Sequence, residues 1–142
     1  MAGVVSEPSA AVHRVVVDTN VVVDVLRGNR RAAAVLRDRI ERGEVLHLSV
    51  LTRFELGAAA RPNELGALVE HLGLYDELEV DGAVAERAGE LARTYRRSHS
   101  AIDAIDYLVA ATAELHADEL LTLDVKHFPM FPGLRAPYRA GS

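Results

Sequence analysis

Three consecutive valines that end in an aspartate, residues 15–18, constrain the fold of this chain more than any other segment. A β-branched run without polar alternation is typical of a strand that is buried on both faces, as in a parallel sheet. We predict that a helix follows directly, over residues 20–27. A buried strand that passes at once into a helix is the repeating unit of α/β domains.

The same alternation continues along the chain. Further strand-like segments cover residues 45–50, 78–80 and 120–123. Helical patterns lie between them, at residues 30–42, 51–60, 65–74, 83–97 and 104–116. Because helical crossovers connect parallel strands, we expect an α/β fold with a central, mostly parallel sheet of about four or five strands. The proline-rich end of the chain leaves room for at most a short edge strand around Leu134.

Length and composition set the class of protein. A chain of 142 residues with 49% hydrophobic content suits one globular domain, which we expect over 1–142, with its core at about 14–138 and frayed ends at 1–12 and 139–142. The sequence shows neither a membrane-spanning run nor an export signal, so we expect a cytoplasmic protein without membrane attachment. The absence of cysteine excludes disulfides, thiolate zinc sites and thiol nucleophiles.

The net charge of −5 argues against broad electrostatic binding of nucleic acid, which normally needs an excess of basic residues. Local basic patches can still coexist with an acidic total. Arg27, Arg30 and Arg31 follow the first predicted helix and could place positive charge near the mouth of a site at the strand ends. We interpret them either as contacts for nucleic-acid phosphates or as solvated charges on helix ends.

Two acids follow predicted strands directly. Asp18 ends the first strand and Asp124 follows the last, and in open α/β sheets the active site lies at the carboxyl ends of the strands. Neighbouring carboxylates there repel unless a cation lies between them. The alternative interpretation is that each aspartate only caps the next helical turn.

Two further acids lie in predicted helices, and each has an alternative explanation. Glu55 follows Thr52 at the spacing of a capping box, and Asp106 follows Asp103 in a first helical turn, where carboxylates complement the helix dipole. Asp106 nevertheless shares a face with small apolar residues, and an acid on an inward face is costly unless it is paired or metal-bound. The six histidines show no spacing typical of metal ligands or acid–base pairs, so we interpret them as structural or exposed.

Four motifs follow one another over residues 15–128. They are Val17-Asp18-Thr19-Asn20, Ser49-x-x-Thr52-x-x-Glu55-Leu56, Asp106-Tyr-Leu-Val-Ala-Ala-Thr-Ala113 and Leu121-Thr-Leu-Asp124-Val-Lys-His-Phe128. In this order they resemble the motifs of PIN-domain ribonucleases, and in particular of the VapC-like toxins of type II toxin–antitoxin pairs.

The resemblance implies a three-layer α/β/α fold and a metal-dependent endoribonuclease that hydrolyses RNA phosphodiester bonds. It implies that Asp18, Glu55, Asp106 and Asp124 are the catalytic, metal-binding acids, and that Thr19, Asn20 and Thr52 support them. It also implies a cognate antitoxin as inhibitor and a homodimer. An all-oxygen site without cysteine or histidine suits Mg²⁺ or Mn²⁺.

Two other functions compete with the ribonuclease. A phosphatase of the haloacid-dehalogenase type also begins with an aspartate at its first strand end, but it normally carries a second one two places on, where this chain has Asn20. A PIN-like binding module without catalysis is the other alternative. Retention of all four acids argues against it.

Overall fold

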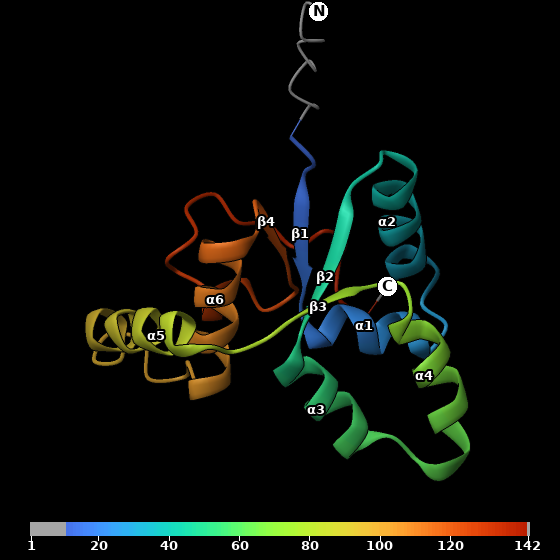
Figure 1. Ribbon diagram of the computed structural model, residues 1–142, viewed down its shortest axis with the longest axis horizontal. Coiled ribbons are helices and arrows are strands. Elements are labelled where there is room, and N and C mark those ends of the chain that lie inside the picture. Colours follow the sequence, from blue (N-terminus) through green and yellow to red (C-terminus); the bar gives the residue numbers. More distant parts are fainter. Residues whose placement is uncertain (1–10, 142) are drawn as a thin grey trace, which may run out of the picture.

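A parallel sheet forms the centre of the molecule (Figure 1), which the computed structural model describes over residues 11–141. Its strands are β1 (Arg14–Val17), β2 (Val45–Ser49), β3 (Asp76–Leu78) and β4 (Glu119–Leu121), in the spatial order β3-β2-β1-β4. All three pairings are parallel. The carboxyl ends of all four strands therefore lie along the same edge, as the sequence predicts.

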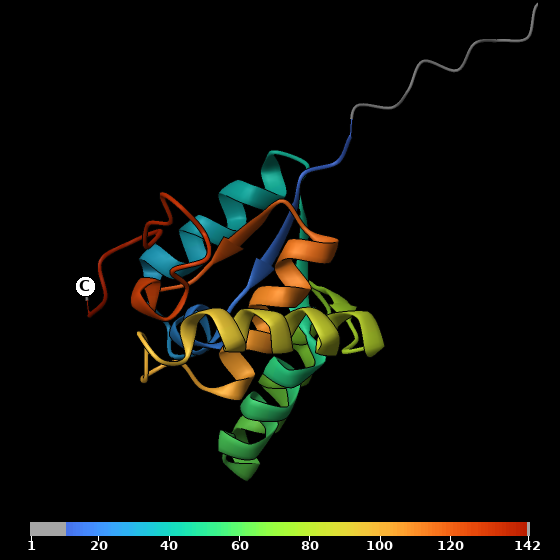
Figure 2. The ribbon, with the colours of Figure 1, turned by 90° about the vertical axis from the view of Figure 1, so that its left-hand side faces the viewer.

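Helices cover both faces of the sheet. The chain contributes α1 (Thr19–Leu26), α2 (Arg30–Glu41), α3 (Val50–Ala59), α4 (Leu65–Leu72), α5 (Gly82–Tyr95) and α6 (Ala104–His116), with short 3-10 turns η1 (Pro62–Glu64) and η2 (Val125–His127). Helices α1 to α4 pack on one face and α5 and α6 on the other (Figures 1 and 2). This arrangement confirms the three-layer α/β/α fold.

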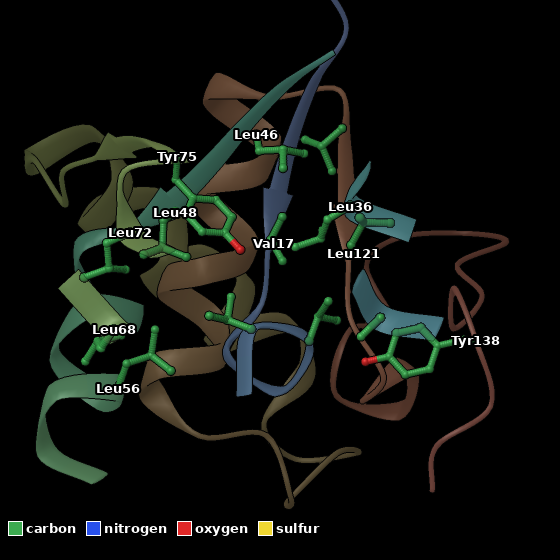
Figure 3. Close-up of a cluster of buried hydrophobic side chains, with 14 residues drawn as sticks. Val17, Leu36, Leu46, Leu48, Leu56, Leu68, Leu72, Tyr75, Leu121 and Tyr138 are labelled. Atoms are coloured by element: carbon green, nitrogen blue, oxygen red, sulfur yellow. The ribbon is translucent and has the colours of Figure 1, made fainter. Parts of the chain in front are cut away.

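The valine run of β1 explains how the layers hold together. Val15 and Val17 point into a cluster with leucines of α2, α3 and α4 (Figure 3), whereas Val16 points into the cluster under α5 and α6. All three side chains are fully buried. Each such burial contributes roughly 1.5–3 kcal/mol, so the strand stabilises both layers.

The strand order reverses beside β1. The chain runs from β1 outward to β2 and β3 with α1 to α4 on one face, then returns through α5 and α6 on the other face to β4, on the opposite side of β1. Such a reversal opens a crevice at the carboxyl ends of the two strands that flank it, which is where ligands bind in open α/β sheets. The fold therefore places a site where β1 and β4 end.

The third strand differs from the prediction. We expected it at residues 78–80, and β3 instead spans Asp76–Leu78. Because β3 is at the edge of the sheet and pairs only with β2, its polar residues remain exposed, and an apolar pattern cannot locate them.

The C-terminal segment packs as an irregular chain. Tyr138 is buried in the cluster beneath α1 and α2, and its hydroxyl donates a 2.7 Å hydrogen bond to Asp24 Oδ2 on α1. No strand follows β4 in residues 122–141. The expected fraying of the ends concerns mainly residues 1–10 and 142, which lie outside the described residues, and it stays a prediction.

Candidate active site

All four predicted acids line one open pocket of about 280 Å³ at the carboxyl edge of the sheet. Asp18 comes from the end of β1, Glu55 from α3, Asp106 from α6, and Asp124 from the segment after β4. Thr19, Asn20, Asp103, Ile105 and His127 complete the lining. Segments far apart in the sequence therefore converge where the strand order reverses.

Asp18 is the most deeply placed of these acids, with 8% of its surface exposed. It caps α1, because its Oδ1 accepts the Thr19 backbone N–H at 2.9 Å, and its Oδ2 accepts the Thr122 hydroxyl at 2.8 Å. Burial raises the pKa of Asp18, and the charges of Asp124 and Glu55 add to the rise, while the two hydrogen bonds oppose it. Asp18 therefore caps α1 and also lines the pocket, so its role as a cap does not exclude a role as a ligand.

Thr122 connects several residues of the site through hydrogen bonds, and the sequence did not predict it. Its fully buried hydroxyl donates to Asp18 and accepts from the Asn20 side-chain amide at 3.2 Å and from the Asp124 backbone N–H at 3.0 Å. The available signal was a lone hydroxyl in the apolar run of the last strand, directly before an acid. Thr122 ties the end of β1 to the segment that carries Asp124.

Asn20 reinforces the same connection from the first turn of α1. Its amide nitrogen lies 3.3 Å from Asp18 Oδ2 and 3.2 Å from Asp124 Oδ2, and it donates toward both carboxylates. Its amide oxygen accepts the Leu123 backbone N–H at 3.0 Å. Asn20 is therefore placed to hold two acids at a fixed separation, in keeping with the supporting position that the sequence motif indicated.

Glu55 is held by threonines and takes no part in a helix cap. The hydroxyl of Thr19 donates to Glu55 Oε1 at 2.7 Å, and Thr19 Oγ1 lies 3.1 Å from the hydroxyl of the buried Thr52. The N-cap of α3 is Ser49, whose hydroxyl accepts the Leu51 N–H. The capping-box interpretation of Thr52 and Glu55 is therefore wrong, and Glu55 remains directed to the pocket.

Asp103 and Asp106 form a reciprocal capping box at the start of α6. Asp103 Oδ1 accepts the Asp106 N–H at 2.9 Å, and Asp106 Oδ2 accepts the Asp103 N–H at 3.2 Å. Burial raises the pKa of Asp106 to about 6, and the charges of Asp103 and Asp18 also raise it, whereas His127 lowers it. Asp106 therefore both caps its helix and presents a carboxylate in the pocket.

The interpretation of all six histidines as structural or exposed is wrong for His127. His127 lines the pocket, and its Nδ1 lies 3.0 Å from Asp106 Oδ2. His47 does have a structural place, because its buried ring lies between the Asp76 carbonyl oxygen and Arg14 Nη1. Spacing along the chain could not reveal the contact of His127, since the fold alone brings η2 to the start of α6.

The predicted arginines lie elsewhere. The residues that line the acidic pocket do not include Arg27, Arg30 or Arg31. Arg27 lines an apolar groove between α1, α3 and α4, and Arg30 lines a hollow between α1 and α2. Since α1 begins at the pocket and its eight residues span about 12 Å, these charges lie at its far end.

A second group of polar side chains gathers at the opposite edge of the sheet. Ligand atoms of His13, Glu44 and Glu119 all lie within 4.8 Å of one another. The Arg39 guanidinium bonds both carboxylates, with Nη1 at 2.9 Å from Glu44 and 2.6 Å from Glu119. It therefore already balances their charge, and its hydrogen bond is the main reason that the pKa of Glu119 is lowered. This group is an ion-pair network that joins α2 to β4.

The acidic pocket is suited to a hard cation. Its four predicted acids supply only oxygen ligands, and Asp18 and Asp106 carry raised pKa values because burial and mutual repulsion disfavour their charged forms. A divalent cation offsets both effects, and Mg²⁺ and Mn²⁺ prefer oxygen ligands of this kind. Fold and pocket together therefore define an α/β protein with an acidic, cation-compatible site at a topological switch point.

Comparison with known proteins identifies the family. The PIN domain family model matches residues 15–130, so this chain belongs to the PIN domain family. Ribonuclease VapC19 of Mycobacterium tuberculosis is 47% identical over 122 residues, covering 86% of this chain and 98% of that protein. Ribonuclease VapC10 of the same species is 37% identical over 124 residues, covering 87% and 92%.

Solved structures agree with this assignment. A toxin–antitoxin complex from Klebsiella pneumoniae superposes with a TM-score of 0.71 at 26% identity, covering 87% of this chain and 98% of that chain. FitAcB from Neisseria gonorrhoeae superposes with a TM-score of 0.65 at 30% identity, covering 80% and 90%.

Proposed function

We propose that this chain is an endoribonuclease that acts as the toxin of a VapBC-type toxin–antitoxin pair, with Asp18, Glu55, Asp106 and Asp124 as its metal-binding acids. The observation that carries this proposal is the convergence of these acids in one pocket at the β1/β4 switch point. The high identity to proteins named ribonucleases, over nearly their whole length, supports RNA as the substrate.

A divalent cation held by Asp18, Glu55, Asp106 and Asp124 would supply Lewis-acid chemistry for phosphodiester hydrolysis. The chain's own residues prepare the site for it. Thr122 and Asn20 hold Asp18 and Asp124 in fixed orientations, and the Thr19 hydroxyl holds Glu55. Because this scaffold exists before substrate binds, little reorganisation is needed during the reaction.

The cation that we propose is Mg²⁺ or Mn²⁺. PIN ribonucleases generally depend on divalent metals, and Mg²⁺ retains several water ligands while it rests on one or two carboxylates. An open pocket with several carboxylates leaves space for such waters and for a phosphate group. The two metals differ little in their preference for oxygen ligands, and we propose that either supports cleavage.

The proposed partner is an antitoxin protein, because the Klebsiella pneumoniae structure that is similar to this chain is a toxin–antitoxin complex. An apolar groove of about 220 Å³ between α1, α3 and α4 is the surface that we assign to it. Leu26, Leu56 and Leu68 contribute to its lining, and Arg27 and Glu64 supply charges for polar contacts.

We further propose a homodimer and a cytoplasmic location. Phe54 and Val69 are 66% and 70% exposed on α3 and α4, and we propose that these two helices contribute to the contact with a second copy. Among residues 11–141 no helix is long and apolar enough to cross a membrane. The Arg27, Arg30 and Arg31 cluster remains a proposed RNA contact that would act away from the acidic pocket.

The decisive experiment compares substrates and metals. The purified chain is expected to cleave single-stranded RNA with Mg²⁺ or Mn²⁺, to lose that activity in excess EDTA, and to leave a generic phosphate monoester intact. Asp18→Asn is the inactive control. Cleavage in EDTA would contradict the metal site, and hydrolysis of the monoester would favour the phosphatase. A metal-binding chain without either activity would indicate a binding module.

A further inference from the structure

His127 lines the acidic pocket but is not one of the proposed metal ligands. It lies at the end of η2, and its side chain and that of Asp106 are 33% and 16% exposed. Its Nδ1 lies 3.0 Å from Asp106 Oδ2, which is within ion-pair distance of that carboxylate oxygen. The contact joins two elements that otherwise approach the pocket from different sides.

The two oxygens of Asp106 have different surroundings. Oδ2 accepts the Asp103 N–H at 3.2 Å and also lies 3.0 Å from His127 Nδ1. For Oδ1, the described residues offer no hydrogen-bond partner. Both contacts fall on one oxygen of the carboxylate, so they restrict its rotation and leave the other oxygen available as a ligand.

The Asp106 carboxylate needs a contact that fixes its orientation. Its carboxylate is repelled by Asp103 within its own turn and by Asp18 across the pocket. Repulsion alone would favour a side-chain rotamer that turns the carboxylate away from the other acids. A donor to Oδ2 would offset that tendency without occupying Oδ1.

We propose that His127 is a positioning residue, which fixes the Asp106 carboxylate through its Nδ1–H and leaves Oδ1 free to bind the cation. The inference rests on the proposed function, since it assigns His127 a task in that metal site. It requires only a donor at Nδ1, which the neutral ring supplies in one tautomer. Partners that orient metal ligands in this way typically change metal affinity by about 10–100-fold when they are removed.

The alternative is that His127 weakens metal binding. If His127 acted instead as a positive charge that occupies the pocket in place of metal, its removal would strengthen metal binding. The direction of the change in metal affinity therefore separates the two.

The experiment measures Mn²⁺ binding to the full chain by isothermal titration calorimetry, with folding checked by circular dichroism and thermal unfolding. Three variants are compared with the wild type. His127→Ala removes the donor, His127→Asn places an amide N–H near the Nδ1 position, and His127→Gln places one near Nε2. His116→Ala is the matched control, because His116 is exposed on the same helix as Asp106.

We expect the Mn²⁺ dissociation constant to rise about tenfold or more in His127→Ala and His127→Gln, and to stay within about threefold of the wild type in His127→Asn and His116→Ala. The concentration of Mn²⁺ that gives half-maximal RNA cleavage should shift in parallel. Unchanged or tighter Mn²⁺ binding by His127→Ala would overturn the inference. If that variant does not fold, equal Mn²⁺ affinities of His127→Asn and His127→Gln would overturn it instead. Failure of the wild type to bind Mn²⁺ would instead refute the proposed metal site.

Discussion

The hydroxyl of Thr122 donates a 2.8 Å hydrogen bond to Asp18 Oδ2, although 104 residues separate the two in the sequence. The bond spans the point where the strand order reverses, between the ends of β1 and β4. It is fully buried, so no water replaces the donor if it is lost. Through it, the packing of β4 against β1 determines the orientation of the deepest acid in the pocket.

Thr122→Val should therefore weaken both the fold and the site. The substitution keeps the shape but removes a donor to Asp18 and an acceptor for Asn20 and the Asp124 backbone, so the free energy of unfolding should fall by about 1–3 kcal/mol. Mn²⁺ affinity should fall as well. Thr122→Ser, which retains the hydroxyl, is the control. Chemical denaturation and calorimetry measure the two effects, and wild-type Mn²⁺ affinity in a folded Val variant would contradict the argument.

Substitutions at the start of α6 should separate the two neighbouring aspartates. Asp106→Asn is expected to abolish RNA cleavage, because it removes a proposed ligand, while the metal-free protein keeps or gains stability as repulsion among the acids is relieved. Asp103→Asn should stay largely active, because Asn caps a helix nearly as well as Asp. Cleavage of single-stranded RNA over a range of Mn²⁺ concentrations tests both. An inactive, folded Asp103→Asn alongside an active Asp106→Asn would reverse the assignment.

The metal-free protein should lose stability as the pH rises from about 4 to 7. Burial raises the pKa of Asp106 from 3.8 to about 6, so in this range the folded state binds more protons than the unfolded state. Stability is then greatest below the unfolded pKa and falls as pH rises through the folded one. Asp18, whose pKa is also raised, contributes in the same direction.

Unfolding of the wild type and of Asp106→Asn is measured in EDTA at several pH values. The difference between the two proteins gives the contribution of Asp106 to the pH dependence of stability. Between pH 4 and pH 7, the free energy of unfolding of the variant should rise relative to that of the wild type by on the order of 2 kcal/mol. Saturating Mn²⁺ should remove much of the loss in the wild type. Parallel pH profiles for the two proteins would show that Asp106 titrates normally.

The sequence predicted the layers and the acids because both leave local signals. The valines of β1 indicate a strand covered on both faces, and acids directly after strands indicate a site at their carboxyl ends. The competing capping explanations were correct for Asp18 and Asp103, and they do not conflict with the pocket. A short side chain at a helix start can accept a backbone N–H with one oxygen and face a cleft with the other.

The contacts that the sequence did not predict join distant segments of the chain. Thr122 and His127 both lie in the last recognised motif, but their partners lie on α1 and α6. Only the packing of η2 against the start of α6 brings His127 to Asp106. The register of β3 was missed for a different reason, since an edge strand with exposed polar residues has no apolar pattern to detect.

The groove between α1, α3 and α4 provides the last prediction, which concerns the antitoxin. Leu26 is 37% exposed and lines this groove at the end of α1 that is remote from the pocket. Leu26→Glu places a charge against the apolar walls, so an antitoxin that binds there should lose at least about tenfold in affinity. Because Leu26 does not touch the acids, Mn²⁺-dependent cleavage by the isolated variant should match that of the wild type.

Leu115→Glu is the matched control, because Leu115 is 46% exposed on α6 and does not line the groove. Each variant is titrated with the cognate antitoxin, and inhibition of RNA cleavage is measured together with binding. Inhibition should require more antitoxin for Leu26→Glu alone. If Leu115→Glu escapes inhibition while Leu26→Glu does not, the antitoxin binds the α5–α6 layer and the assignment of the groove is wrong.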